Sequence, residues 1–164
     1  MKKGFTLVEI MIVVAIIALL AAIAIPNLLR ARLNANESAA IATCQTLSTA
    51  LQSYRAVNPA TGFPAVDLAS LAPAGQPPYV DATLAIAAPS RQGYNFAYNP
   101  GVADLNGVLH DFFIYASPIT PNTTGVRGFY IDEGGVICGV SPAAAPVHAI
   151  PGSACPAAPW AALQ

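Results

Sequence analysis

An apolar segment near the start of the chain constrains its fold more than any other feature. From Phe5 to Ile25 the only charged residue is Glu9. As an α-helix, a segment of this length extends about 31 Å, which matches the hydrocarbon core of a bilayer. Lys2 and Lys3 directly precede it, and this order predicts a cytoplasmic N-terminus with the rest of the chain on the far side. We therefore expect residues 5–25 to span a membrane.

Two other interpretations fit the same segment. A cleaved signal peptide has a basic start, an apolar run and a small-x-small site, which Ala22-Ile23-Ala24 provides, so that the mature chain starts at Ile25. A buried core helix is the second alternative. An apolar run this long with one charge is rare in a small soluble domain, which argues against the core helix. Glu9 argues against the signal peptide, because a carboxylate within a bilayer costs about 2.5–3.5 kcal/mol and is usually paired and functional. A disposable signal peptide gains nothing from such a charge.

The stretch Gly4-Phe5-Thr6-Leu7-Val8-Glu9 resembles the processing site of type IV pilins and their pseudopilin relatives. The resemblance implies that residues 1–4 are a leader, which prepilin peptidase removes by cutting between Gly4 and Phe5. It further implies that the same enzyme, acting as a methyltransferase, N-methylates Phe5. Glu9 then matches the glutamate that is the hallmark of the family, and Pro26 matches a proline in the family's long helix.

The resemblance also suggests what Glu9 does. In a bundle of identical subunits, the Glu9 carboxylate of one copy meets the Phe5 amine of a neighbour. Each charge is costly alone in an apolar setting, so their pairing favours one height of each subunit relative to the next. We expect Phe5 and Glu9 to be the subunit assembly residues of a helical filament.

The helical pattern continues beyond the apolar segment, over residues 26–57. Apolar residues recur at spacings of four, three, four and three, which predicts one buried stripe; they are Ala40, Cys44, Leu47, Leu51 and Tyr54. The polar residues that fall mainly off this stripe are Arg30, Arg32, Glu37, Gln45, Gln52 and Arg55. Asn58-Pro59 ends the helix. Pro26 is the expected helix break, because proline lacks the donor that a helix requires.

The remainder predicts a small α+β head. Residues 58–92 are rich in Pro, Ala and Gly and are expected to be a connecting loop with one helical turn near 67–71. Residues 93–140 contain strand patterns in GYNFAYN, HDFFIYAS, GFYID and VICGV. The last two flank Glu133-Gly134-Gly135, a hairpin signal. We expect three or four antiparallel strands to cover the stripe of the helix, an arrangement that the pilin resemblance also implies.

Three cysteines leave one without a partner. Cys138 ends the last predicted strand, and Cys155 lies in residues 141–164, a Pro/Ala-rich C-terminal loop for which we expect no regular structure. Outside the membrane the compartment is oxidising, so these two cysteines are candidates for a bridge. Many pilins close their C-terminal region in this way, and the resemblance favours a Cys138–Cys155 disulfide. Cys44 is then a small buried residue, although a bridge from Cys44 to a tail cysteine stays open.

The sequence gives little support for catalysis or for a cofactor. His110 and His148 are the only histidines, and His110 is expected to be a strand-edge residue beside Asp111. No haem motif, phosphate loop or metal-ligand cluster is present in the sequence, and Asp132-Glu133 is better explained as a solvated turn than as a calcium site. Without the leader, five arginines face eight acids, a net charge of −3, so a nucleic-acid partner is not indicated. We expect no enzyme, no metal and no cofactor.

The function predicted from the resemblance is structural. A type IV pilin is held in the inner membrane and is then polymerised by the pilus assembly machinery into an extracellular filament at the cell surface. Its partners are identical subunits, the peptidase and methyltransferase, and the membrane before assembly. The alternative is a pseudopilin of a type II secretion or DNA-uptake machine. The leader motif does not distinguish the two.

Overall fold

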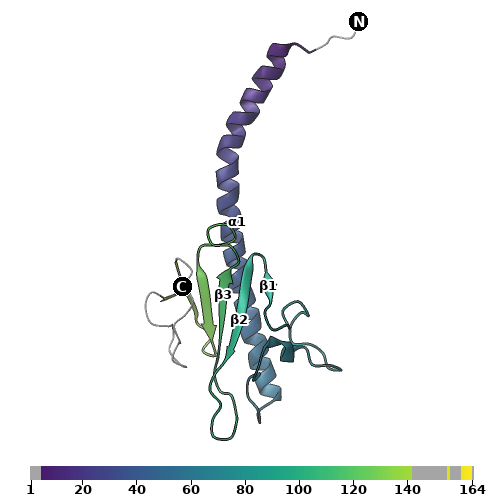
Figure 1. Cartoon of the computed structure of the whole chain (residues 1–164), viewed down its shortest axis with the longest axis vertical. Coiled ribbons are helices and arrows are strands. Elements are labelled where there is room, and N and C mark those ends of the chain that lie inside the picture. The colour runs from purple at the N-terminus through teal and green to yellow at the C-terminus, as the bar shows by residue number, and fades with distance from the viewer. Residues whose placement is uncertain (1–4, 142–154, 156–159, 164) are drawn as a thin grey trace.

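The computed structural model describes residues 5–141, 155 and 160–163. One helix, α1 (Leu7–Val57), dominates the molecule and extends over about 77 Å. Figure 1 shows that its N-terminal half projects alone, while its C-terminal half lies behind a sheet. We call residues 7–32 the rod, and the described residues from 33 onward the head. The leader, residues 1–4, lies outside the described residues.

The two ends of α1 are capped by polar residues. Thr6 is the N-cap, and the side chain and backbone of Asn58 bond to carbonyls of the last turn, including that of Tyr54 at 2.9 and 3.0 Å. Pro26 lies inside the helix without interrupting it. The expected break at Pro26 is therefore absent from this single chain. A proline in an isolated helix removes one hydrogen bond, which a bend can accommodate without ending the helix. A break on assembly stays a prediction.

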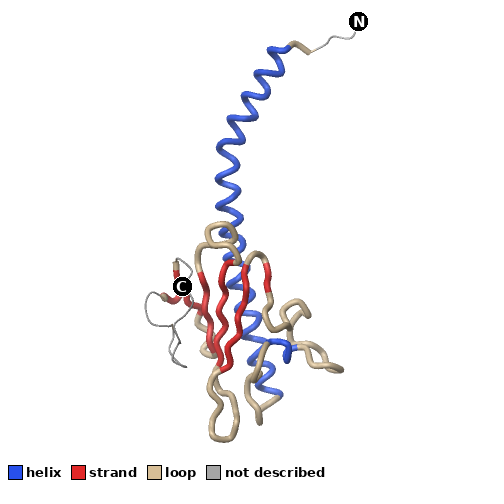
Figure 2. The backbone as a smooth tube through the Cα atoms, viewed as in Figure 1, coloured by secondary structure: helices blue, strands red, loops and turns tan. Residues whose placement is uncertain are grey.

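The head is an α+β structure, as predicted. Its antiparallel sheet has six strands in sequential order, and Figure 2 shows them in front of α1. The strands are β1 (Ser90–Arg91), β2 (Tyr94–Pro100), β3 (Phe112–Pro118), β4 (Gly128–Asp132), β5 (Ile137–Val140) and β6 (Ala161–Ala162). The predicted three or four strands are β2 to β5. The prediction missed β1 and β6, because two residues are too few to produce an alternating pattern.

The predicted core is confirmed where helix and sheet meet. Ala40, Cys44, Leu47 and Leu51 of α1 are almost fully buried, and Tyr54 packs beside them. Strand β2 alternates as expected, with Tyr94, Phe96 and Tyr98 buried on the helix side. Strand β3 lies in the middle of the sheet and is apolar on both faces. The hairpin between β4 and β5 turns at Gly135, whose φ of 75° favours glycine.

A second, smaller core covers the opposite face of the sheet. Trp160 packs against Tyr130 and Tyr115, with ring centroids 6.1 and 5.9 Å away. Cys138, Val140 and Cys155 complete this cluster. Strand β6 follows Trp160 directly and pairs with β5, so part of the C-terminal region is regular where none was expected. The connecting loop between α1 and the sheet agrees with the prediction: the 3₁₀ helix η1 (Leu68–Leu71) lies where one helical turn was expected.

Candidate functional site

The N-terminus of the rod is held by a reciprocal pair of hydrogen bonds. The Thr6 backbone N–H and hydroxyl both donate to Glu9 Oε2, each at 2.8 Å. The Glu9 N–H donates in return to Thr6 Oγ1 at 3.2 Å. This capping box satisfies amides that a helix N-terminus otherwise leaves unpaired. In the isolated subunit, therefore, the Glu9 carboxylate is bonded within its own chain.

Thr6 is the residue that the sequence-based argument missed. The signal was present, because Thr6-Leu7-Val8-Glu9 is a threonine followed by a glutamate three residues later. Phe5 lies beside this box and is 85% exposed. Gly4 is outside the described residues. A contact between Glu9 and the Phe5 amine of another copy requires a second subunit, so that contact stays a prediction.

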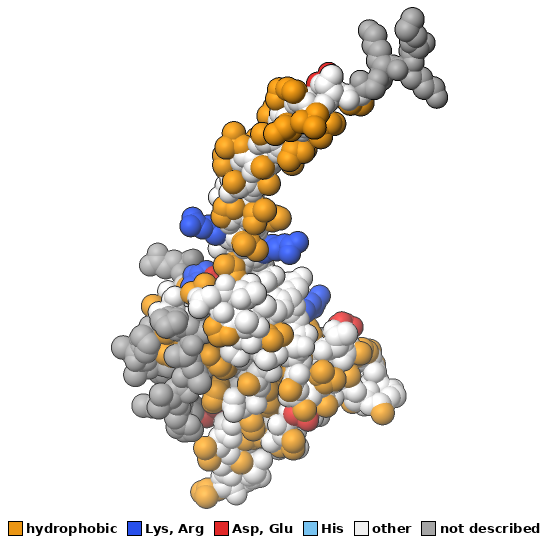
Figure 3. Space-filling view, turned by 45° about the horizontal axis from the view of Figure 1, so that its top comes forward, with side chains coloured by type: hydrophobic (Ala, Val, Ile, Leu, Met, Phe, Trp, Pro, Cys, Tyr) orange, Lys and Arg blue, Asp and Glu red, His pale blue; other side chains and the backbone are white. Residues whose placement is uncertain are grey.

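The rod offers an apolar surface with no partner in this chain. Every large apolar side chain from Phe5 to Leu29 is at least 50% exposed. The helix contains an 18-residue window with a mean hydropathy of 3.0, long and apolar enough to cross a membrane by length and composition. Figure 3 shows hydrophobic side chains covering the rod, and basic side chains, all of them arginine, where it meets the head.

A buried acid fastens α1 to the sheet near that junction. Glu37 is 5% exposed, and its Oε1 accepts hydrogen bonds from the backbone N–H groups of Val126 and Arg127, at 3.0 and 3.2 Å. Its Oε2 accepts from Arg127 Nε at 2.7 Å. Asn36 adds a bond to the Thr124 carbonyl at 2.9 Å. We call Asn36, Glu37 and the loop 124–127 the clamp.

The clamp corrects one expectation and sets the charge state of Glu37. The sequence placed Glu37 off the buried stripe, but a position three residues before Ala40 lies on the same side of a helix. Burial by itself raises the pKa of the Glu37 carboxyl, but the hydrogen bonds from Val126 and Arg127 and the Arg127 charge outweigh it. The net effect holds the pKa of Glu37 below its usual value, so the carboxyl is ionised at neutral pH.

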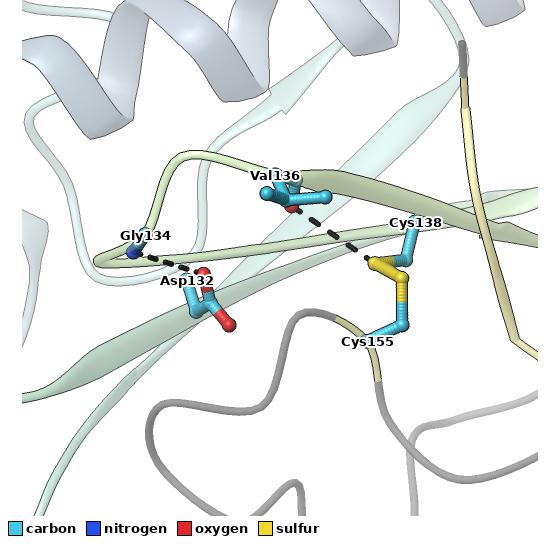
Figure 4. Close-up of a disulfide and its surroundings, with 5 residues drawn as sticks. All are labelled: Asp132, Gly134, Val136, Cys138 and Cys155. Carbon is cyan, nitrogen blue, oxygen red and sulfur yellow. Dashed lines mark hydrogen bonds between the residues drawn. A yellow bond between two sulfur atoms is a disulfide. The ribbon is translucent and has the colours of Figure 1, made fainter.

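The predicted disulfide joins the tail to the sheet. Cys138 of β5 is bonded to Cys155, with Cα atoms 5.7 Å apart, and Figure 4 shows the bridge beside the β4–β5 turn. Cys44 is free and buried in the helix-side core. The alternative bridge from Cys44 to a tail cysteine is therefore absent. The disulfide and the packing of Trp160 attach Cys155 and residues 160–163 to the outer face of the sheet.

The remaining polar candidates have local roles. His110 pairs with Asp104 at 3.1 Å rather than standing alone beside Asp111. Burial, and then the Glu133 charge, raise the pKa of Asp132, whose Oδ1 accepts from Gly134 N–H within the turn. Among the described residues, no group of three or more His, Cys, Asp or Glu is placed to hold a metal ion.

A long exposed apolar helix that continues into a small α+β head is the architecture implied by the pilin resemblance. Residues 1–25 match the family described as "Prokaryotic N-terminal methylation motif". The chain is 67% identical over 36 residues to the type IV wide pilus major component PilA4 of Thermus thermophilus, which is 22% of this chain and 28% of that protein. It is 50% identical over 53 residues to the type IV major pilin protein PilA of Myxococcus xanthus, which is 32% of this chain and 24% of that protein.

Pseudopilins match as well. The chain is 39% identical over 57 residues to the type II secretion system core protein G of Escherichia coli, which is 35% of this chain and 39% of that protein. Together these matches confirm the resemblance to type IV pilins and pseudopilins, a family of structural subunits. The aligned segments span about a quarter to two fifths of these relatives. No solved structure matches the chain.

Proposed function

We propose that this chain is the structural subunit of a type IV pilus. Prepilin peptidase cuts between Gly4 and Phe5 and methylates the new amine of Phe5. The rod then holds the subunit in the inner membrane, with the head outside the cytoplasm. The assembly machinery extracts the subunit, and identical copies polymerise through their rods into an extracellular filament.

The observation that carries the proposal is the exposed apolar rod, which ends in a carboxylate. A monomer with this much unpartnered apolar surface requires either lipid or other copies of itself around residues 7–29. Both environments are apolar and exclude water, so the Glu9 carboxylate needs a positive partner there to offset the free-energy cost of its charge. The Phe5 amine of a neighbouring copy meets this need, because processing creates it four residues from Glu9.

A pseudopilin of a type II secretion system is the second candidate function. The similarity to core protein G favours it, whereas the higher identities to the two pilins and the disulfide-closed tail favour the pilus subunit. Electron microscopy of material sheared from cells, with an antibody against the head, separates the two. Long labelled fibres are expected for a pilus subunit. Label that stays with the cell envelope, with no fibres, would favour the pseudopilin.

The proposed cleavage is tested by changing the residue before the cut. Gly4→Leu places a bulky side chain at the junction and is expected to leave uncut precursor in the membrane. Gly4→Ala, a small change at the same position, is the matched control and should be cut more completely. Mass spectrometry of the mature N-terminus should find methylated Phe5 in the wild type. Normal processing of Gly4→Leu would contradict the proposed cleavage site.

The proposed role of Glu9 is tested by separating its charge from its capping bond. Glu9→Gln keeps a side-chain oxygen for the Thr6 amide but removes the charge, whereas Thr6→Ala removes the cap and keeps the charge. Leaving the partner amine unpaired in an apolar setting costs about 3–5 kcal/mol per subunit. We therefore expect Glu9→Gln to accumulate as membrane-held monomer without sheared polymer, and Thr6→Ala to form filaments. Abundant fibres made of Glu9→Gln subunits alone would refute the assembly role.

A further inference from the structure

The arginines of the chain gather at one end of the head. Arg30 and Arg32 lie on the exposed rod immediately before the head begins. Arg127 is bonded to Glu37 in the clamp, and Arg91 lies beside Ala39 and Thr43 of α1. Only Arg55 lies at the opposite end, stacked over the Phe63 ring at 5.1 Å. The end of the head that faces the rod is therefore basic.

Apart from Glu37, which pairs with Arg127 in the clamp, most acids of the head lie at the other end. Glu133 lies in the β4–β5 turn, where its carbonyl accepts a hydrogen bond from Gln52, near the end of α1. Asp104 and Asp111 lie in the β2–β3 loop, residues 101–111, which Figure 1 shows at the end of the molecule opposite the N-terminus. Asp67 caps η1, which follows the end of α1. The two ends of the head along the direction of α1 thus carry charges of opposite sign.

The β2–β3 loop has a defined shape. Asp104 Oδ1 accepts from the backbone N–H groups of Asn106 and Val108, at 2.8 and 2.9 Å, and Asp104 Oδ2 pairs with His110. The base of the loop is fixed by two hydrogen bonds between Leu109 and the segment 61–63, at 3.0 and 3.1 Å. The loop shaped by these contacts exposes two apolar side chains to solvent: Leu105, which is fully exposed, and Val102, which is 78% exposed.

The rod-facing end offers a surface of matching chemistry. Leu28 and Leu29 are each 56% exposed, and Arg30 and Arg32 follow them on the helix. We call these four residues the collar. Collar and loop are both mixtures of exposed aliphatic side chains with charges of one sign, basic in the collar and acidic in the loop. Each surface is complementary to the other and repels its own kind.

We propose that the β2–β3 loop of one copy docks on the collar of another copy. The inference rests on the proposed function, since it requires parallel rods with heads staggered along one axis. In such a stack the distal end of one head always faces the rod-facing end of the next. A contact between two different surfaces of identical chains does not close on itself, and it generates an open filament. Leu105 enters the collar beside Leu28, and Asp104 and Asp111 face Arg32, which lies four residues after Leu28 and therefore on the same side of α1.

The test reverses each surface separately in the full-length chain, expressed beside a wild-type control in cells that contain pilus assembly machinery. The collar-reversed variant carries Arg30→Glu and Arg32→Glu. The loop-reversed variant carries Leu105→Lys and Asp111→Arg and keeps Asp104, which holds the shape of the loop. Each variant alone opposes like charges at every contact, so sheared polymer should fall at least about tenfold. Membrane-held monomer and the Cys138–Cys155 disulfide, scored by mobility without reductant, should be retained.

Co-expression gives the decisive result. Collar-reversed and loop-reversed subunits together form complementary contacts in both directions when they alternate, so filaments containing both should return. A single chain carrying both reversals should also polymerise by itself. The controls are Arg91→Glu and Asp81→Arg, which each reverse one charge outside the collar and the loop and should leave polymer at the wild-type level.

The other outcomes overturn the inference. If wild-type subunits form filaments and both reversed variants form them equally well, the docking is wrong while the proposed function stands. If wild-type subunits form none, the proposed function itself fails. If the collar-reversed variant fails but neither co-expression nor the double reversal restores polymer, the collar does not bind the loop. Reduced membrane retention of that variant would then assign the collar to anionic lipid headgroups.

Discussion

At the scale of single residues, the clamp makes Glu37 the side chain whose loss should matter most to the head. Glu37→Ala leaves the Val126 and Arg127 amides without their acceptor and should lower the free energy of unfolding by about 3 kcal/mol. Glu37→Gln keeps one acceptor oxygen, so its loss should be smaller. Urea unfolding of the full chain in detergent measures both. Equal stability of Glu37→Ala and the wild type would contradict the clamp.

The same residue predicts a pH dependence. Because the pKa of Glu37 is lowered in the folded head, its contribution is fully present above its ordinary value of 4.5 and is lost as the pH falls through the lower folded value. The stability difference between wild type and Glu37→Gln should therefore be constant near neutral pH and shrink in acid. A difference that grows below pH 4.5 would refute the assignment.

Cys44 should be chemically inert in the folded protein. Burial raises the pKa of its thiol to about 12, so almost none is present as reactive thiolate at neutral pH. Without reductant, we expect iodoacetamide to add no label to the native chain and one label per chain after unfolding, since Cys138 and Cys155 are bonded to each other. Intact mass spectrometry counts the labels. A labelled native chain would show that Cys44 is accessible.

At the scale of elements, the disulfide and strand β6 should stabilise the tail as one unit. Replacing Cys138 and Cys155 by serine opens a loop whose closure is worth about 3 kcal/mol in the chain-entropy model. Trp160, the only tryptophan, is 8% exposed and reports on this unit alone. Its fluorescence should shift to the red and become quenchable by iodide in the double variant, whereas Cys44→Ala should leave it unchanged. An unshifted emission would mean that Trp160 stays docked without the bridge.

The elements also explain which parts of the fold the sequence predicts. The stripe from Ala40 to Leu51 and the alternation in β2 are repeated over many residues, so periodicity identifies them. The contacts of Glu37 with Arg127 and of Trp160 with Tyr130 were not predicted. The two residues of each pair are distant in the sequence, and a contact made by one residue produces no periodic pattern. The resemblance at Gly4 to Glu9 predicts processing residues that one isolated chain does not test.

At the scale of the whole molecule, the rod and the head are independent. The large apolar side chains of residues 5–29 are exposed, and the buried residues of α1 begin at Glu37. The free energy of folding of the head therefore arises from contacts that the rod does not make. The proposed polymerisation requires a rod that stays available to other copies after the head has folded. Under the proposed function, separate stabilisation of the two parts would allow one subunit to exist first in a membrane and then in a filament.

This independence predicts the behaviour of fragments. A chain of residues 30–164 should be soluble, should form the Cys138–Cys155 disulfide, and should unfold at the same temperature as the full chain in detergent. A fragment of residues 38–164 is the sharper comparison, because it keeps the apolar stripe but lacks Asn36 and Glu37. Loss of the clamp should lower its unfolding temperature by about 10 °C, from a cost of about 3 kcal/mol in a head of this size. Calorimetry of both fragments measures the difference. Equal unfolding temperatures would show that the stripe alone fastens α1 to the sheet and that the clamp contributes nothing.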